Sequence, residues 1–215
     1  MTLAFSGPEP VSVPIAGSGA RFPVHRVYCV GRNYADHVRE MGGEVGREPP
    51  FFFAKPPDAL VTAGYFPYPA MTEDVHHEVE LVVALGPEAR LFGYAVGLDM
   101  TRRDLQAAAK NLGRPWEVAK SFDHSAPISP ITASEQVLTS GAITLDVNGM
   151  RRQTGDISQM IWNIPEIITE LAKLFTLKPG DLIFTGTPSG VSAVARGDKL
   201  HAEIAGVGTL KVDVI

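Results

Sequence analysis

Short apolar runs separated by glycine, proline and polar turns predict a chain built mainly from β-strands. Strands are expected over eight segments, 26–30, 51–54, 78–85, 94–99, 142–147, 181–185, 199–204 and 209–214. The run 51–54, Phe-Phe-Phe-Ala, is apolar at every position, so we expect a buried strand there. Asn148-Gly149 favours a tight turn and predicts a hairpin after 142–147.

Fewer segments have the spacing of an amphipathic helix. Helices are expected over three segments, 33–41, 102–111 and 165–175. Thr101, with Asp104 three residues later, resembles a helix-starting cap. The glycine-rich residues 42–50 predict a mobile loop. Strands outnumber helices, so the fold class is mixed α+β and mostly β.

The chain of 215 residues shows no internal repeat and no linker, which indicates one domain. With 45% apolar residues, it is long enough to bury a sizeable core. Residues 1–25 are rich in glycine, proline and serine, and we expect an irregular lead-in with short strand pieces around 11–13. A single catalytic domain is then expected over 26–215.

Charge and composition exclude several classes of partner. The net charge is −5 without any lysine-rich or arginine-rich run, so no nucleic-acid partner and no membrane partner is expected. No apolar stretch approaches the roughly 20 residues that span a bilayer. Met1–Pro14 lacks the pattern of a secretion signal, so the cytoplasm is the expected compartment. The single cysteine, Cys29, lies in an apolar run and is expected to pack in the core.

Three acidic residues interrupt apolar runs. Glu78 and Glu80 flank Val79 in one run, and Asp99 ends the next. Side chains two apart on a strand share a face, so both glutamates can bind one ion. Two bare carboxylates about 4 Å apart repel by roughly 4 kcal/mol at an effective dielectric near 20. The pattern favours Mg²⁺, Mn²⁺ or Ca²⁺ over zinc or copper, and it equally fits a half-solvated strand face.

A second cluster lies in the predicted helix 33–41. His37 and Glu40 are three residues apart and therefore neighbours on one helix face. The carboxylate can orient the imidazole, which then takes a proton from water. An ordinary ion pair on a surface helix gives the same pattern. The glycine-rich loop that follows adds to the functional interpretation, because mobile lids often carry catalytic groups.

The third cluster is cationic. Arg103 and Gln106 share a helix face, and Lys120 follows in the sequence Ala-Lys-Ser-Phe. Each can bind a substrate oxygen, and each fits an ordinary surface residue as well. The segment 184–190 predicts a strand that runs into a glycine-flanked turn whose N–H groups can hold an anion. It lacks the lysine and the spacing of a Walker loop, so it does not predict nucleotide binding.

Taken in order, these segments resemble the fumarylacetoacetate hydrolase family over residue 26 to the end. The motifs that carry the resemblance are Tyr-Cys-Val-Gly-Arg-Asn-Tyr-Ala-Asp-His at 28–37, His-His-Glu-Val-Glu-Leu at 76–81, Gly-Leu-Asp-Met-Thr-Arg-Arg-Asp-Leu-Gln at 97–106, Ala-Lys-Ser-Phe-Asp at 119–123 and Thr-Gly-Thr-Pro-Ser-Gly at 185–190. Within the family the chain is similar to the small acylpyruvate hydrolases, and among these to the fumarylpyruvate hydrolases of gentisate breakdown in aromatic catabolism.

The resemblance implies a β-rich roll, a homodimer and a set of functional residues. It implies that Glu78, Glu80 and Asp99 bind the metal, usually Mg²⁺ or Mn²⁺. It implies that the catalytic residues are His37, Glu40 and Lys120, with the first two on a closing lid. It implies that Arg103, Gln106 and Thr187 line the substrate site, and Arg32 is expected to bind substrate as a candidate cation.

The implied reaction is hydrolysis of a 2,4-diketo acid at a carbon–carbon bond. A fumaryl substrate needs a cation for its far carboxylate, and the sequence does not choose among Arg32, Arg47, Lys55 and Arg103. An oxaloacetate decarboxylase, an isomerase of unsaturated keto acids and a silent metal-binding scaffold are the alternatives. Retention of every motif residue argues against the scaffold.

Overall fold

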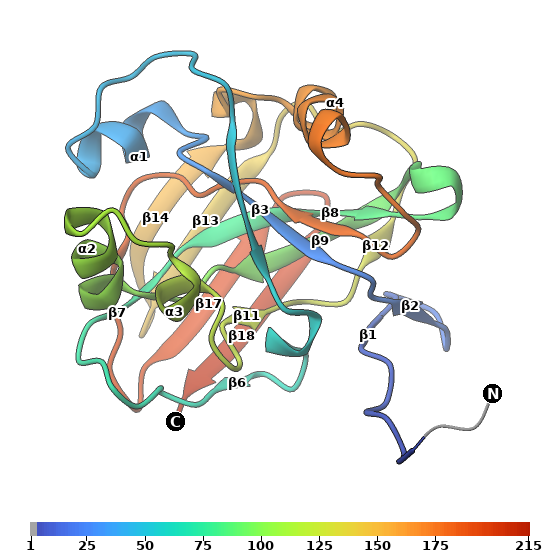
Figure 1. Cartoon of the computed structure of the whole chain (residues 1–215), viewed down its shortest axis with the longest axis horizontal. Coiled ribbons are helices and arrows are strands. Elements are labelled where there is room, and N and C mark those ends of the chain that lie inside the picture. The colour runs from blue at the N-terminus through green and yellow to red at the C-terminus, as the bar shows by residue number, and fades with distance from the viewer. Residues whose placement is uncertain (1–3) are drawn as a thin grey trace.

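The computed structural model describes residues 4–215, and residues 1–3 of the predicted lead-in lie outside the described part. Two sheets form the body (Figure 1). The six-stranded sheet has the order β12 (Thr132–Ala133), β9 (Leu91–Leu98), β8 (Val79–Leu85), β15 (Leu182–Phe184), β3 (Val27–Gly31) and β4 (Phe51–Lys55). The five-stranded sheet has the order β14 (Met150–Asp156), β13 (Ala142–Val147), β17 (Lys199–Ile204), β18 (Gly208–Val214) and β6 (Tyr65–Phe66).

Shorter elements complete the fold. The remaining strands are β1 (Ser12–Pro14), β2 (Arg21–Pro23), β5 (Leu60–Val61), β7 (Val75–His77), β10 (Thr101–Arg102), β11 (Ala126–Pro127) and β16 (Ser192–Ala193). The α-helices are α1 (Ala35–Glu40), α2 (Arg103–Asn111), α3 (Glu117–Lys120) and α4 (Ile164–Leu174). Three 3₁₀ turns cover Pro57–Ala59, Pro87–Ala89 and Ile157–Gln159.

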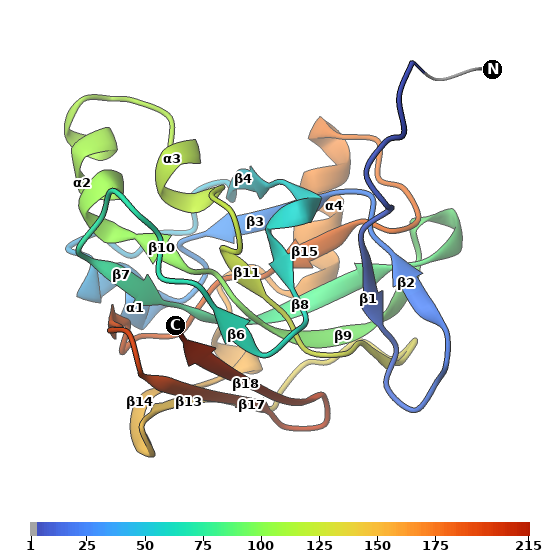
Figure 2. The ribbon, with the colours of Figure 1, turned by 90° about the horizontal axis from the view of Figure 1, so that it is seen from below.

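The centre of the six-stranded sheet is buried on both faces, which explains why β8 is apolar almost throughout. One face packs against the five-stranded sheet, which lies beneath β8 and β9 in Figure 2. On that face Leu81 and Val83 join a core that includes Leu145 and Ala202. The opposite face packs against the N-terminal strands and β11. Burial of this apolar surface is the main stabilising term of the fold.

Among the helices, α4 packs its buried side chains Ile164, Ile167 and Leu171 into the main core. Both views place α2 and α3 together at one end, with α4 away from them (Figures 1 and 2). None of the helices within residues 4–215 has the length and apolar character needed to cross a bilayer.

The predicted fold class is confirmed, because the structure is mostly β with few helices. The hairpin at Asn148-Gly149 and the helix predicted over 165–175 are both present. The short strand expected near residues 11–13 is β1, which pairs with β2.

Two local predictions are wrong. The strand at 51–54 is not buried, because β4 forms the edge of its sheet and leaves Phe51 40% exposed. Thr101 does not cap α2. Its hydroxyl donates to the carbonyl of Asp99 at 3.1 Å and accepts from Lys120 at 2.7 Å, and α2 begins after Arg102 without a side-chain cap.

Candidate active site

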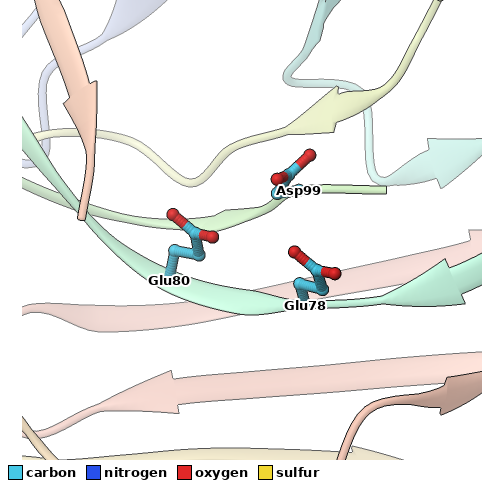
Figure 3. Close-up of side chains that lie close together, drawn as sticks. All are labelled: Glu78, Glu80 and Asp99. Atoms are coloured by element: carbon cyan, nitrogen blue, oxygen red, sulfur yellow. The ribbon is translucent and has the colours of Figure 1, made fainter. Parts of the chain in front are cut away.

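Three acidic side chains, Glu78, Glu80 and Asp99, meet on one face of the six-stranded sheet (Figure 3). Glu80 lies on β8 opposite Gly97 of β9, and the N–H of Asp99 donates to the carbonyl of Glu78 at 2.9 Å. Alternation along the strand puts both glutamates on the same side, and the strand register brings Asp99 beside them. Ligand oxygens from the three residues lie within 4.8 Å of one another, and all three residues are buried.

Basic side chains surround these acids. Nζ of Lys120 donates to Oε2 of Glu78 at 2.7 Å and to Oδ2 of Asp99 at 2.6 Å. Nη2 of Arg103 donates to Oε1 of Glu78 at 2.6 Å. Nζ of Lys55 lies 2.8 Å from Oδ1 of Asp99 without the alignment of a hydrogen bond, so that contact is ionic. Each buried acid except Glu80 therefore has at least one cationic partner.

Burial and charge act differently on the glutamates. Burial disfavours ionisation of Glu78, but the charges of Lys120 and Arg103 outweigh it and lower the pKa of this carboxyl. Glu80 accepts a hydrogen bond from the N–H of Gly186 at 2.8 Å and has no cationic hydrogen-bond partner within the described chain. Burial, followed by repulsion from the other two acids, raises the pKa of Glu80 well above its ordinary value.

This arrangement fits a hard divalent cation. Carboxylate oxygens are the ligands that Mg²⁺, Mn²⁺ and Ca²⁺ prefer. Oδ1 of Asp99 accepts no hydrogen bond from any residue in 4–215, so it has lone pairs to offer a metal. A dication would also offset the free-energy cost of burying the charge of Glu80, the acid without a cationic partner. The donor set and its spacing therefore suit the ion that the sequence predicts.

The predicted dyad lies on α1. Nδ1 of His37 is 3.1 Å from Oε2 of Glu40, while Oε1 of Glu40 accepts from the N–H of Gly190 at 2.9 Å. When Nδ1 donates to the carboxylate, Nε2 is the nitrogen that can accept a proton. Nδ2 of Asn33 donates to the carbonyl of Thr185 at 2.8 Å and fixes the start of α1 to the central sheet.

The turn after β15 is held by buried amide contacts. Nε2 of Gln153 donates to Oγ1 of Thr187 at 2.8 Å, and Oε1 of Gln153 accepts from the N–H of Val79 at 3.0 Å. The sequence predicts that N–H groups of this turn hold an anion. In the structure, the N–H groups of Gly186 and Gly190 donate to the side-chain carboxylates of Glu80 and Glu40.

One cavity gathers nine of the ten residues predicted for the site. They are Arg32, His37, Glu78, Glu80, Asp99, Arg103, Gln106, Lys120 and Thr187. The tenth, Glu40, contacts the cavity only through His37. The structure thus brings together residues that are up to 155 positions apart, from Arg32 to Thr187.

Sequence reasoning overlooked several contributors. Lys55 ends an apolar run as Asp99 does, so the rule that singled out the acids would also have marked it as a buried charge. Lys110 lies seven residues after Arg103, which continues the helix face already noted. No sequence pattern marks Gln153, because its role depends on a contact between two sheets.

Residues 26–215 match the family described as fumarylacetoacetate (FAA) hydrolase C-terminal. The chain belongs to the fumarylacetoacetate hydrolase family. The resemblance predicted from the sequence motifs is therefore confirmed. The fold expected for this family is confirmed as well, because solved structures of family members match nearly the whole chain.

Relatives in this family carry more than one activity in their names. The crystal structure of fumarylpyruvate hydrolase from Pseudomonas aeruginosa, in complex with Mn²⁺ and pyruvate, matches with a TM-score of 0.96 and 49% identity, covering 100% of this chain and 99% of that one. A fumarylpyruvate hydrolase from Ralstonia sp is 42% identical over 78% of this chain and 93% of its own length. The mitochondrial oxaloacetate tautomerase FAHD1 of Rattus norvegicus is 46% identical over 87% of this chain and 90% of its own length.

Proposed function

We propose that this chain is a divalent-cation-dependent hydrolase that cleaves a carbon–carbon bond in an acylpyruvate. The proposed substrate is fumarylpyruvate, which water splits into fumarate and pyruvate. The observation that carries the proposal is the His37–Glu40 pair, whose imidazole lines the same cavity as the acidic triad. Hydrolysis needs an activated water beside the keto-acid substrate, and this pair supplies the base that activates it.

The metal site is proposed to consist of Glu78, Glu80 and Asp99. These residues would hold one Mg²⁺ or Mn²⁺, with Ca²⁺ as a possible substitute. When bound, the ion supplies Lewis-acid chemistry toward the oxygens of a keto acid. The Mn²⁺ and pyruvate in the Pseudomonas aeruginosa fumarylpyruvate hydrolase support this assignment.

The protein groups divide the remaining work. His37, oriented by Glu40, takes a proton from a water through Nε2, and the water oxygen attacks carbon 4 of the substrate. The bond between carbons 3 and 4 breaks, and its electron pair remains on carbon 3. Lys120 offers its ammonium to the negative charge that develops on the pyruvate part. The proton that His37 took from the water is returned to carbon 3, which completes pyruvate and restores His37.

Arg103, Gln106 and Thr187 are proposed to bind and orient the substrate. Nη1 of Arg103 donates to Oε1 of Gln106 at 2.7 Å, and this bond fixes the guanidinium and the side-chain amide in the cavity lining. Thr187 is buried, and the hydrogen bond from Gln153 orients its hydroxyl. Such fixed groups hold a substrate in a reactive geometry without further ordering.

The second candidate function is oxaloacetate tautomerisation, which the 46% identity to the rat FAHD1 enzyme favours. This reaction moves a proton between carbon and oxygen and breaks no carbon–carbon bond. A decarboxylase at the same site would release CO₂ and need no attacking water. The three reactions therefore differ in their products.

The test is product analysis during loss of the ultraviolet absorbance of the acylpyruvate enol. Wild-type protein with Mg²⁺ or Mn²⁺ should convert fumarylpyruvate into equal amounts of fumarate and pyruvate, and EDTA should abolish the conversion. Oxaloacetate is tested in parallel. Rapid tautomerisation of oxaloacetate without any cleavage of fumarylpyruvate would reject the hydrolase function and support the tautomerase function.

The cellular setting belongs to the same proposal. Gentisate breakdown in aromatic catabolism is the setting in which fumarylpyruvate would be consumed. We propose a cytoplasmic enzyme that forms a homodimer, as the family resemblance implies. Light scattering during size-exclusion chromatography tests the oligomeric state, and a mass near 23.1 kDa, that of one chain, would contradict the dimer.

A further inference from the structure

Cationic side chains other than Lys120 also line the cavity. They are Arg32, Arg103 and Lys110. Arg32 and Lys110 are exposed, whereas the acidic triad and Lys120 are buried, so the cavity runs from an acidic floor toward a cationic outer part. A ligand that fits both ends carries oxygen ligands for a metal at one end and a negative charge at the other.

Most cations near the cavity already have partners. Arg103 donates to Glu78 and Gln106. The Lys55 side chain is fully buried against Asp99 and does not line the cavity. Arg47 pairs with Glu166 outside it. Two of the sequence candidates for a far-carboxylate site, Lys55 and Arg47, are thereby ruled out.

Lys110 differs from these groups. Its ammonium lies 5.1 Å from the ring centre of Trp116, and no carboxylate of residues 4–215 is within ion-pair distance of it. Partial burial of the ammonium, followed by repulsion from Arg103 and Arg32, lowers the pKa of Lys110. A carboxylate bound beside Lys110 would relieve that repulsion.

Lys110 also has a suitable position along α2. Arg103, Gln106 and Lys110 follow the spacing i, i+3, i+7, so they form one stripe facing the cavity. Seven residues of helix separate Arg103 from Lys110, which corresponds to a rise of about 10 Å. Gln106 lies between them, so the stripe presents polar groups along the whole interval.

We infer that Lys110, together with Arg32, binds the carboxylate at the acyl end of the substrate and makes this chain selective for dicarboxylic acylpyruvates. The inference deepens the proposed function and depends on it for the reaction. It concerns a residue that the sequence motifs do not include.

The length of the substrate agrees with this assignment. A seven-carbon chain such as that of fumarylpyruvate spans about 7–8 Å at a carbon–carbon bond length near 1.5 Å. One hydrogen bond of about 3 Å at its far end brings the total close to the helix interval. Oxaloacetate, with four carbons, is about 4 Å shorter at the same bond length, so we expect it to make no contact with Lys110 when its keto-acid end lies at the acidic triad. Binding at Lys110 would therefore distinguish the two candidate substrates.

The test uses binding, so that it does not depend on turnover. Two ligands without a 4-keto group, 2-oxoheptanedioate and 2-oxoheptanoate, differ only in the far carboxylate and cannot be cleaved. Calorimetry with Mn²⁺-loaded protein should give the dioate about tenfold or greater advantage in wild type. Lys110→Met should remove most of that advantage, with Arg32 accounting for the remainder, and should leave the affinity for 2-oxoheptanoate unchanged. Lys110→Arg should retain most of it.

Lys211→Met is the matched control, because it removes an exposed lysine from β18 and lowers the net charge equally. It should behave as wild type. Equal binding of both ligands by wild type, an unchanged preference in Lys110→Met, or the same loss in Lys211→Met would each overturn the inference. If the protein prefers the dioate but does not cleave fumarylpyruvate, the hydrolase proposal is rejected. The carboxylate site at Lys110 would still be supported.

Discussion

His37 is the residue whose replacement separates catalysis from metal binding. It contacts Glu40 and lines the cavity, and it is not one of the three carboxylates that would hold the ion. His37→Ala should lower kcat for fumarylpyruvate by about 10²–10⁴, because a general base contributes that much. Mn²⁺ affinity, measured by calorimetry, should remain near that of wild type. Wild-type turnover in this variant would show that the dyad is not the base.

Lys110 gives the site a pH dependence with a defined sign. The groups that act on its charge besides burial are Arg103, Arg32 and Lys120, which lower its pKa, and Glu78, which raises it. A lysine with a lowered pKa loses its charge earlier than an ordinary lysine as pH rises. The preference for 2-oxoheptanedioate should therefore decline in alkaline buffer below the usual lysine range.

Lys110→Arg supplies the control for this titration, because arginine stays charged throughout. Its preference for the dioate should persist across the same buffers, from about pH 7 to 10. A parallel decline in both proteins would assign the effect to another group.

The acidic residues of the site were predictable from sequence, whereas the ion pairs that they form were not. Glu78 and Glu80 stand out because charge inside an apolar strand is costly and the two-residue repeat puts them on one face. Lys55 bonds to Asp99 across 44 residues of sequence, a contact that only the pairing of distant strands creates. Residue patterns report local burial, whereas ion-pair partners depend on topology.

At the scale of elements, the turn after β15 connects α1 to the acidic triad. Gly186 has φ +97°, and a Cβ there would lie 2.7 Å from Cβ of Asn33. Gly197 has φ +92° with no atom within 4 Å of the same position. Gly197→Ala should cost only the backbone strain of about 1–2 kcal/mol. Gly186→Ala should cost a further 1–3 kcal/mol or so from overpacking.

Urea unfolding of the two glycine variants measures this difference. Gly186→Ala should also bind Mn²⁺ more weakly than Gly197→Ala, because its N–H holds Glu80. Equal free energies of unfolding for both variants would contradict the packing of α1 against this turn.

Elements with strong local signals were predictable. The hairpin followed from Asn148-Gly149, and α4 followed from apolar residues at helical spacing behind Pro165. The errors occurred where tertiary position decides. Phe51 belongs to an apolar run, yet β4 lies at a sheet edge that no local pattern specifies. Thr101 carried a cap pattern, but Lys120 and the Asp99 carbonyl engage its hydroxyl.

At the scale of the whole molecule, metal binding should stabilise the fold. The site joins β8 to the end of β9, both in the central sheet, so an ion held there opposes unfolding of that sheet. Free Mn²⁺ at 100 times its Kd adds about 2.7 kcal/mol. For a chain of this size, the Tm should rise by roughly 5–10 °C. Glu80→Ala should lose this shift, and calorimetric scans with and without EDTA measure it.

A Tm that rises equally in wild type and in Glu80→Ala would assign the stabilising ion to another site. His37→Ala provides the matched control, since it alters the cavity without removing a predicted ligand. Its Tm should respond to Mn²⁺ as the wild type does.

The central claim is that Glu78, Glu80 and Asp99 hold one divalent cation that binds a keto acid. The most direct test is anomalous diffraction from crystals grown with Mn²⁺ and oxalate, a mimic of the pyruvate enolate. We expect one manganese peak per chain, within about 2.0–2.6 Å of an oxygen from each acid and chelated by oxalate. Acids that remain paired with Lys120 and Lys55 in abundant Mn²⁺, without a peak between them, would contradict the account.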